Sequence, residues 1–205
     1  SGTLDASCSP IKFVVASVPL TWNGNVSGAW DISTTPNWKF AALTGLTYPD
    51  GDAVTFNDSL AGTSAITLDT VVNPLSVTFS NSTHSYSLTG AGYISGSTAL
   101  VKNGTNTLIV DTDNDYIGGT TILGGTLQVG NNDTHGTLGF GSVTNLTGGA
   151  IIAFNRTDSI SVGTITRTTV DNSARLVINS GTVSLGGTGD NSGTIATVNN
   201  GGTLI

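Results

Sequence analysis

The chain has 205 residues, of which 9% are charged and 28 are glycine, and its formal net charge is −7. All 13 acidic residues are aspartate, which favours turns, and there is no glutamate or methionine, so the composition argues against a helical fold. Nucleic acid and anionic membranes are disfavoured as partners, because either requires a basic face. No apolar run has the length of a membrane span, so no membrane insertion is expected.

Residues 1–20 are expected to form a leader with one strand at Phe13–Val18. This strand lies in the most apolar stretch of the chain, Ile11–Leu20, which Pro19 closes. Cys8 is the only cysteine, so no disulfide can form within the chain.

Residues 21–98 contain all three tryptophans and are expected to form a cap and the first coils of an elongated fold. We expect Trp22, Trp30 and Trp38 to plug the first coil, because buried indole rings contribute a large apolar area where a cap needs it. The alternative interpretation is a platform on which a glycan ring stacks, made of the same three tryptophans.

Residues 99–205 contain no tryptophan or proline and show short apolar runs with period-two alternation, separated by glycine pairs. A phrase of small residues followed by an apolar strand recurs every 20–30 residues or so, which is typical of a β-helix coil. We see this phrase at Gly125-Thr126-Leu127, Gly149-Ala150-Ile151, Gly181-Thr182-Val183 and Gly202-Thr203-Leu204. The predicted inner column comprises Leu108, Val110, Ile122, Leu127, Val129, Ile151, Val162, Ile165, Leu176, Ile178, Val183, Leu185, Ile195 and Leu204.

Residues 100–130 give this pattern a specific form. They contain Leu100-Val101-Lys102-Asn103-Gly104, Tyr116-Ile117-Gly118-Gly119-Thr120 and Gly124-Gly125-Thr126-Leu127-Gln128-Val129-Gly130. This order resembles the autotransporter-associated β-strand repeat of passenger domains and other large bacterial surface proteins. The upstream segment resembles a cap that often precedes such repeats. The resemblance implies an all-β, right-handed parallel β-helix (β-solenoid) with an aromatic-rich N-terminal cap, located extracellularly or at the bacterial cell surface.

The best metal candidate is the run from Asp111 to Asp115. Asp111, Asp113 and Asp115 alternate along one loop, as the ligands do in the first half of a calcium loop. However, Tyr116 replaces the glycine expected at the sixth position, and Ile122 replaces the bidentate glutamate expected at the twelfth. We therefore weigh a calcium site against a solvated turn, and expect no other cofactor.

Glycan cleavage is the main catalytic alternative, because many β-helices degrade polysaccharides, and hydrolysis needs two carboxylates at a set separation. Five charged residues fall in one region and could share a face: Arg156, Asp158, Arg167, Asp171 and Arg175. No dense constellation of acids, bases and aromatics accompanies them, so we predict that the chain is not an enzyme.

Strand edges at the two ends of the chain are the expected partner surfaces. Thr203, Leu204 and Ile205 continue the repeat phrase, so their edge is expected to pair with the next coil of a longer chain or with another molecule. The leader, with Phe13 and Val15, could cover such an edge in a neighbouring copy and give a head-to-tail filament. The predicted function is thus a structural or adhesive rod, with surface glycans as possible partners.

Overall fold

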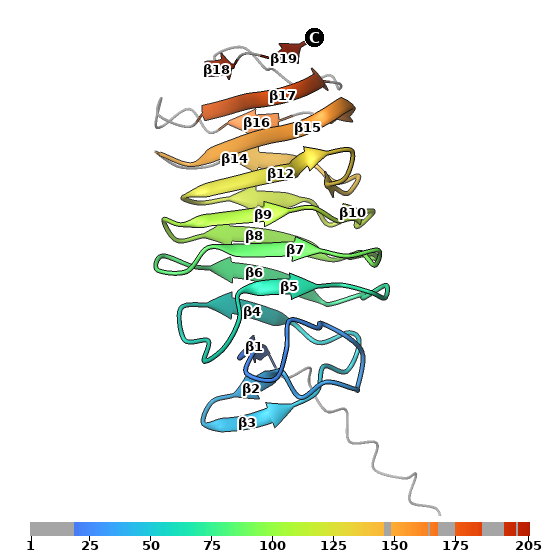
Figure 1. Ribbon diagram of the computed structural model, residues 1–205, viewed down its shortest axis with the longest axis vertical. Helices are drawn as coiled ribbons and strands as arrows, with labels where there is room; N and C mark the ends of the chain where they lie inside the picture. The colour runs from blue at the N-terminus through green and yellow to red at the C-terminus, as the bar shows by residue number, and fades with distance from the viewer. Residues whose placement is uncertain (1–18, 146–148, 164, 168–174, 186–194, 200) are drawn as a thin grey trace, which may run out of the picture.

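The computed structural model describes residues 19–145, 149–163, 165–167, 175–185, 195–199 and 201–205. Every regular element within these ranges is a β-strand, and no helix there could cross a membrane. The strands stack as successive rungs along one axis (Figure 1). The predicted all-β parallel solenoid is therefore confirmed. The leader strand predicted at Phe13–Val18 lies outside the described residues.

The first sheet forms one side of the solenoid, in the order β16-β14-β11-β8-β6-β4-β1-β2-β3. From β1 and β4 onward each strand pairs in parallel with the strand one coil further along the chain. The aligned residues Val54, Val77, Leu100, Thr120 and Val143 are 20–23 residues apart. Its strands are β1 (Leu20–Trp22), β2 (Trp38–Phe40), β3 (Leu43–Leu46), β4 (Val54–Asn57), β6 (Ser76–Ser80), β8 (Ala99–Asn103), β11 (Thr120–Ile122), β14 (Val143–Asn145) and β16 (Ile165–Arg167).

The second sheet runs along the solenoid in the order β18-β17-β15-β12-β9-β7-β5, with β19 also paired to β17. Its aligned residues Ile66, Leu88, Val110, Val129 and Phe154 are 19–25 residues apart. A third face is built from short pieces, among them the two-stranded sheet of β10 and β13. These strands are β5 (Ala65–Thr67), β7 (Tyr86–Thr89), β9 (Thr107–Val110), β10 (Asp113–Asn114), β12 (Thr126–Asp133), β13 (Thr137–Leu138), β15 (Ile151–Val162), β17 (Arg175–Leu185), β18 (Ile195–Val198) and β19 (Gly202–Leu204).

Alternation within each strand explains the core, because parallel stacking places inward residues directly above one another. In β9 and β12, Leu108, Val110, Leu127 and Val129 are fully buried, as predicted. Ile122, Val162, Ile165, Leu176, Ile178 and Val183 are also in the core. The predicted column is wrong at three places: Ile151 and Leu185 are only half-buried, and Leu204 is 37% exposed. The side chain of Ile195 lies outside the description.

The repeat phrases align only in part. Gly181-Thr182-Val183 pairs with Gly202-Thr203-Leu204, as predicted from the sequence. The alignment of Gly149-Ala150-Ile151 with the neighbouring phrases is wrong, because Thr126 rather than Leu127 pairs with Ile151. A one-residue shift exchanges the two faces of a strand, so Ile152 takes the buried position predicted for Ile151.

The N-terminal cap is an aromatic cluster beneath the first parallel rungs. Trp22 and Trp38 pack edge to face with ring centroids 5.1 Å apart, and Trp30 lies 5.5 Å from Trp38. Phe56 contacts all three indoles and stacks on Phe79 at 4.4 Å, which joins the cap to the solenoid core. The predicted aromatic-rich cap is confirmed.

Candidate functional site

An acidic corner lies where β9 turns toward β10 and, in the next coil, where β12 turns toward β13. We define it as Asp111, Asp113, Asp115, Asp133 and His135. Asp113 Oδ2 lies 2.8 Å from His135 Nδ1, and both side chains are more than half exposed. The hydrogen bond and the negative charge of Asp113 raise the pKa of His135 above its ordinary value. Asp133 Oδ1 in turn accepts a hydrogen bond from the His135 backbone N–H, which orders the loop.

Asp111 has different surroundings within the same corner. Its Oδ1 atom is buried without a hydrogen-bond partner. Burial, and then the charge of the adjacent Asp133, raise the pKa of Asp111. Asp115 instead faces a neighbouring pocket. Asp111 and Asp113 therefore share His135 as a neighbour, whereas Asp115 lies against the pocket. No three His, Cys, Asp or Glu side chains in the described ranges form a group suited to a metal ion.

Arg156 fastens the acidic corner to the next coil. Its side chain is 6% exposed, and its Nε and Nη2 atoms donate to the two oxygens of Asp158 at 2.8 Å each. Its Nη1 atom donates to the carbonyl of Gly136 at 2.6 Å, and Nη2 also reaches the carbonyl of Thr134. The guanidinium thus replaces backbone hydrogen bonds between two coils, and its hydrogen bond and charge lower the pKa of Asp158.

This arrangement gives Arg156 and Asp158 a structural role in holding two coils. Asp171, the other carboxylate considered for glycan cleavage, lies outside the described residues, as does the side chain of Arg167. Arg175 begins β17 and pairs with Ile151 of β15. Of the two carboxylates considered for glycan cleavage, the structure therefore describes only Asp158, and both of its oxygens accept hydrogen bonds from Arg156.

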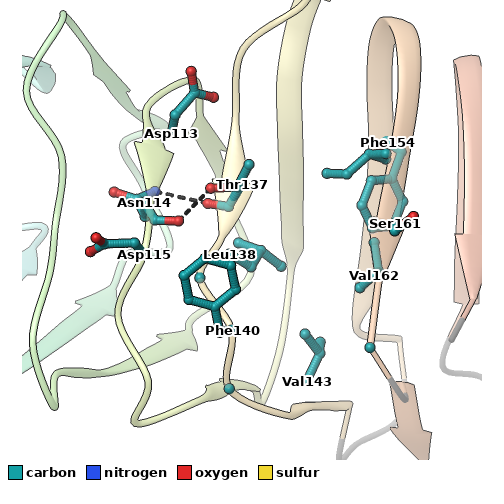
Figure 2. A pocket seen from close by; sticks show the side chains of 14 residues that line it. Asp113, Asn114, Asp115, Thr137, Leu138, Phe140, Val143, Phe154, Ser161 and Val162 are labelled. Carbon is teal, nitrogen blue, oxygen red and sulfur yellow. Dashed lines mark hydrogen bonds between the residues drawn. The ribbon is translucent and has the colours of Figure 1, made fainter. Parts of the chain in front are cut away.

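A pocket of about 360 Å³ adjoins the acidic corner (Figure 2). Asp113, Asn114 and Asp115 lie on one side of it, and Ser161 and Val162 lie on the other. Asn114 is buried and bonds the strand that pairs with β10: its Nδ2 donates to the carbonyl of Thr137 in β13 at 2.8 Å. The remaining lining residues are Thr137, Leu138, Gly139, Phe140, Gly141, Val143, Phe154, Ile160 and Gly163.

The comparisons identify one part of this solenoid. Residues 100–129 match the family described as the passenger-associated-transport-repeat. This segment is therefore similar to a passenger repeat, and the term passenger repeat below refers to residues 100–129. It supplies β8, β9, β10, β11 and the first half of β12, and so includes most of the acidic corner. The resemblance seen in residues 100–130 is confirmed. Neither the comparison with curated proteins nor that with solved structures found a match.

The passenger repeat contains a buried cation that sequence analysis missed. Lys102 is fully buried in β8, between Phe79 of the preceding rung and Ile122 of the following one. Its Nζ donates to the carbonyls of Asn103 at 2.8 Å, Gly104 at 3.0 Å and Gly124 at 3.2 Å. Burial lowers the pKa of Lys102 to about 8. Alternation from Leu100 places this lysine inward, so the signal was present in the sequence.

The tryptophans of the predicted glycan platform do not reach the surface. Trp22, Trp30 and Trp38 are 0% exposed. A sugar ring stacks only on an exposed aromatic face, so the platform interpretation is wrong in this structure and the plug is the observed arrangement. Trp22 Nε1 donates to the carbonyl of Thr63 at 2.8 Å, which fixes the cap to the first coil.

The predicted assembly edge is partly described. Phe13 and Val15 lie outside the described residues. Thr203 and Leu204 belong to β19, which pairs with β17. Leu204 is 37% exposed and Ile205 is 74% exposed. An apolar edge therefore faces solvent at this end of the described solenoid.

Proposed function

We propose that this chain is part of an extracellular structural rod, exported as a passenger and displayed on a bacterial surface. The observation that carries the proposal is the position of the passenger repeat. Its strands β8, β9, β11 and β12 lie in the middle of the stack and pair with rungs on both sides. The neighbouring coils therefore extend the same architecture beyond the matched residues.

The use of polar groups supports a structural rather than a catalytic role. Buried polar side chains such as Lys102 and Arg156 spend their hydrogen bonds on carbonyls between coils. Asn81 does the same, donating to the carbonyls of His84 at 2.7 Å and Thr107 at 3.0 Å. Side-chain donors that are already bonded to backbone carbonyls are poorly placed to act on a substrate.

Surface labelling tests this function directly. Antibodies raised against the purified chain are expected to label intact cells of the source bacterium, and external protease is expected to remove the label. A cytoplasmic protein of the same cells is the control for leakage. Labelling that appears only after permeabilisation would refute surface display. Release of reducing sugar from polysaccharides by the purified chain would refute the non-catalytic part of the proposal.

An adhesive or filament-forming role is the finer form of this proposal. The phrase Gly202-Thr203-Leu204 of β19 supports it, because it pairs in parallel with the equivalent phrase of β17, and strands of this kind favour pairing with a further strand. Electron microscopy of the chain over a concentration series tests it, with I205K as the matched variant. Fibres that shorten in I205K would support end-to-end assembly, whereas single short rods at every concentration would refute it.

A further inference from the structure

The third face of the solenoid is interrupted at one rung. β13 (Thr137–Leu138) pairs only with β10. The second half of β15, Ser159–Val162, pairs with β17, while β12 pairs with β15 only as far as Arg156. Within the described residues, β13 and this half of β15 therefore have no ladder between them. They border the same pocket, and Figure 2 shows Thr137 and Leu138 of one strand and Ser161 and Val162 of the other among the side chains that line it.

The interruption is local to this face. On the first sheet the same two turns pair through Thr120 and Val143, and on the second through Val129 and Phe154. We call the space between β13 and Ser159–Val162 the slot. It is a gap in the third face at a level where both large sheets are continuous.

Arg156 explains why the rung is missing. The carbonyls of Thr134 and Gly136 accept from its guanidinium, at the point where a parallel ladder would offer them backbone N–H groups. The buried side chain thus takes the place of a strand at the corner. The strands beyond it leave the register, and their facing backbone edges stay open.

The chemistry of the slot selects its occupant. Two open edges of parallel strands require an extended backbone. Leu138 and Phe154 give it an apolar floor, and Phe140, at its rim, is 82% exposed. Asp113 and Asp115 lie at one end, and Asp115 Oδ1 is buried without a hydrogen-bond partner. None of the lining residues is lysine or arginine. The slot therefore fits an extended strand in which an apolar residue, for the floor, is adjacent to a cationic residue, for the aspartates.

We propose that residues 11–15 of a second copy of this chain dock in the slot as an added strand. Their sequence, Ile11-Lys12-Phe13-Val14-Val15, places one lysine between two large apolar residues. In the docked strand Phe13 faces the apolar floor and Lys12 faces the aspartates, because successive side chains point to opposite faces.

A second copy is required because the chain's own leader is too short. Between four and five rungs of the first sheet separate β1 from the level of the slot. At about 4.8 Å per rung this distance is roughly 21 Å along the axis alone. The five residues from Val15 to Leu20 span at most about 18 Å when fully extended.

Charge reversal tests the contact. Sedimentation velocity of the full chain over a concentration series is expected to show association that K12D and D115K each weaken about tenfold. The double variant K12D/D115K is expected to regain it, since the two charges exchange places across the interface. K39D, which makes the same charge change in the cap, is the control and is expected to leave association unchanged.

Three outcomes would overturn the proposal. They are a monomer at all concentrations, association equal in the wild type and both single variants, and a double variant that stays weak. Loss of association in I205K but not in K12D would also overturn it, because the contact would then lie at the C-terminal edge.

A second measurement guards against loss of folding in D115K, whose structure is checked by circular dichroism. A labelled peptide of residues 9–19 is titrated into the F13D chain, whose own leader can no longer compete. Saturable binding by fluorescence anisotropy, lost when the peptide itself carries F13D, supports the slot. Equal binding of both peptides overturns it.

Discussion

Replacement of Lys102 by methionine should change how the stability of the solenoid depends on pH. The side chain is fully buried, and burial lowers its pKa from 10.5 to about 8. Between these values the unfolded chain keeps a proton that the folded chain has lost. The unfolded state then binds more protons, so the free energy of unfolding rises with pH in this window.

The magnitude follows from the size of the shift. Each pKa unit corresponds to about 1.4 kcal/mol, so the wild type should gain roughly 2–3 kcal/mol relative to K102M between pH 7.5 and pH 10. Burial also raises the pKa values of Tyr48, Tyr86 and Tyr116, which makes stability fall as the unfolded tyrosines ionise above pH 10. Both proteins share this loss, so the difference between them isolates the lysine.

Urea unfolding at half-unit pH steps, followed by circular dichroism and tryptophan fluorescence, measures the effect. The two signals report the whole solenoid and the cap, and they should agree if the array unfolds as one unit. K39M is the matched control, because Lys39 is only half-buried and lies in the cap. A difference between wild type and K102M that stays constant across this pH range would refute the reasoning. The three carbonyls would then fully offset the burial of the charge.

Three further predictions concern packing and turns. Trp38→Ala should cost about 3–5 kcal/mol of unfolding free energy, whereas Phe40→Ala in the same strand, where the ring is 45% exposed, should cost much less. Gly104→Ala should lower the melting temperature more than Gly45→Ala. Both glycines have positive φ, but a Cβ at position 104 would lie 2.3 Å from a backbone oxygen of the preceding coil, and one at position 45 meets nothing within 4 Å. Equal losses would show that backbone strain, not coil spacing, sets the cost. Burial alone would raise the pKa of Asp58, but three backbone N–H donors of the next turn lower it. Its contribution to stability should therefore disappear as the pH falls below about 4, and Asp58→Asn should flatten that acid limb in urea titrations.

Much of the fold followed from local pattern. Alternation at Leu108, Val110, Leu127 and Val129 predicted which side chains are buried, because a strand has only two faces. The passenger repeat was identifiable for the same reason, since its glycines and apolar residues recur at fixed positions. The terminal pairing of Gly181–Val183 with the last phrase could also be predicted.

The local sequence pattern did not predict the register between neighbouring strands or the packing partners of buried side chains. Gly149-Ala150-Ile151 was aligned one residue out of register, because Ile151 and Ile152 are both apolar and the local pattern does not say which of them faces inward. The three tryptophans were expected to plug the first coil and they do, but the sequence also left open a platform for a sugar. Both arrangements require the same residues at the same spacing.

The sequence by itself determined the class of fold, the length of a coil and the aromatic cap, because these depend on residue periodicity and composition. Only the tertiary structure decided which polar groups are buried and what they bind. Lys102 bonds carbonyls of its own coil and of the next one, where Gly124 lies 22 residues further along the chain. Arg156 bonds carbonyls of the preceding coil, where Gly136 lies 20 residues back. Such contacts depend on how neighbouring turns stack, and the slot beside Arg156 exists because one side chain there replaces a rung of backbone hydrogen bonds.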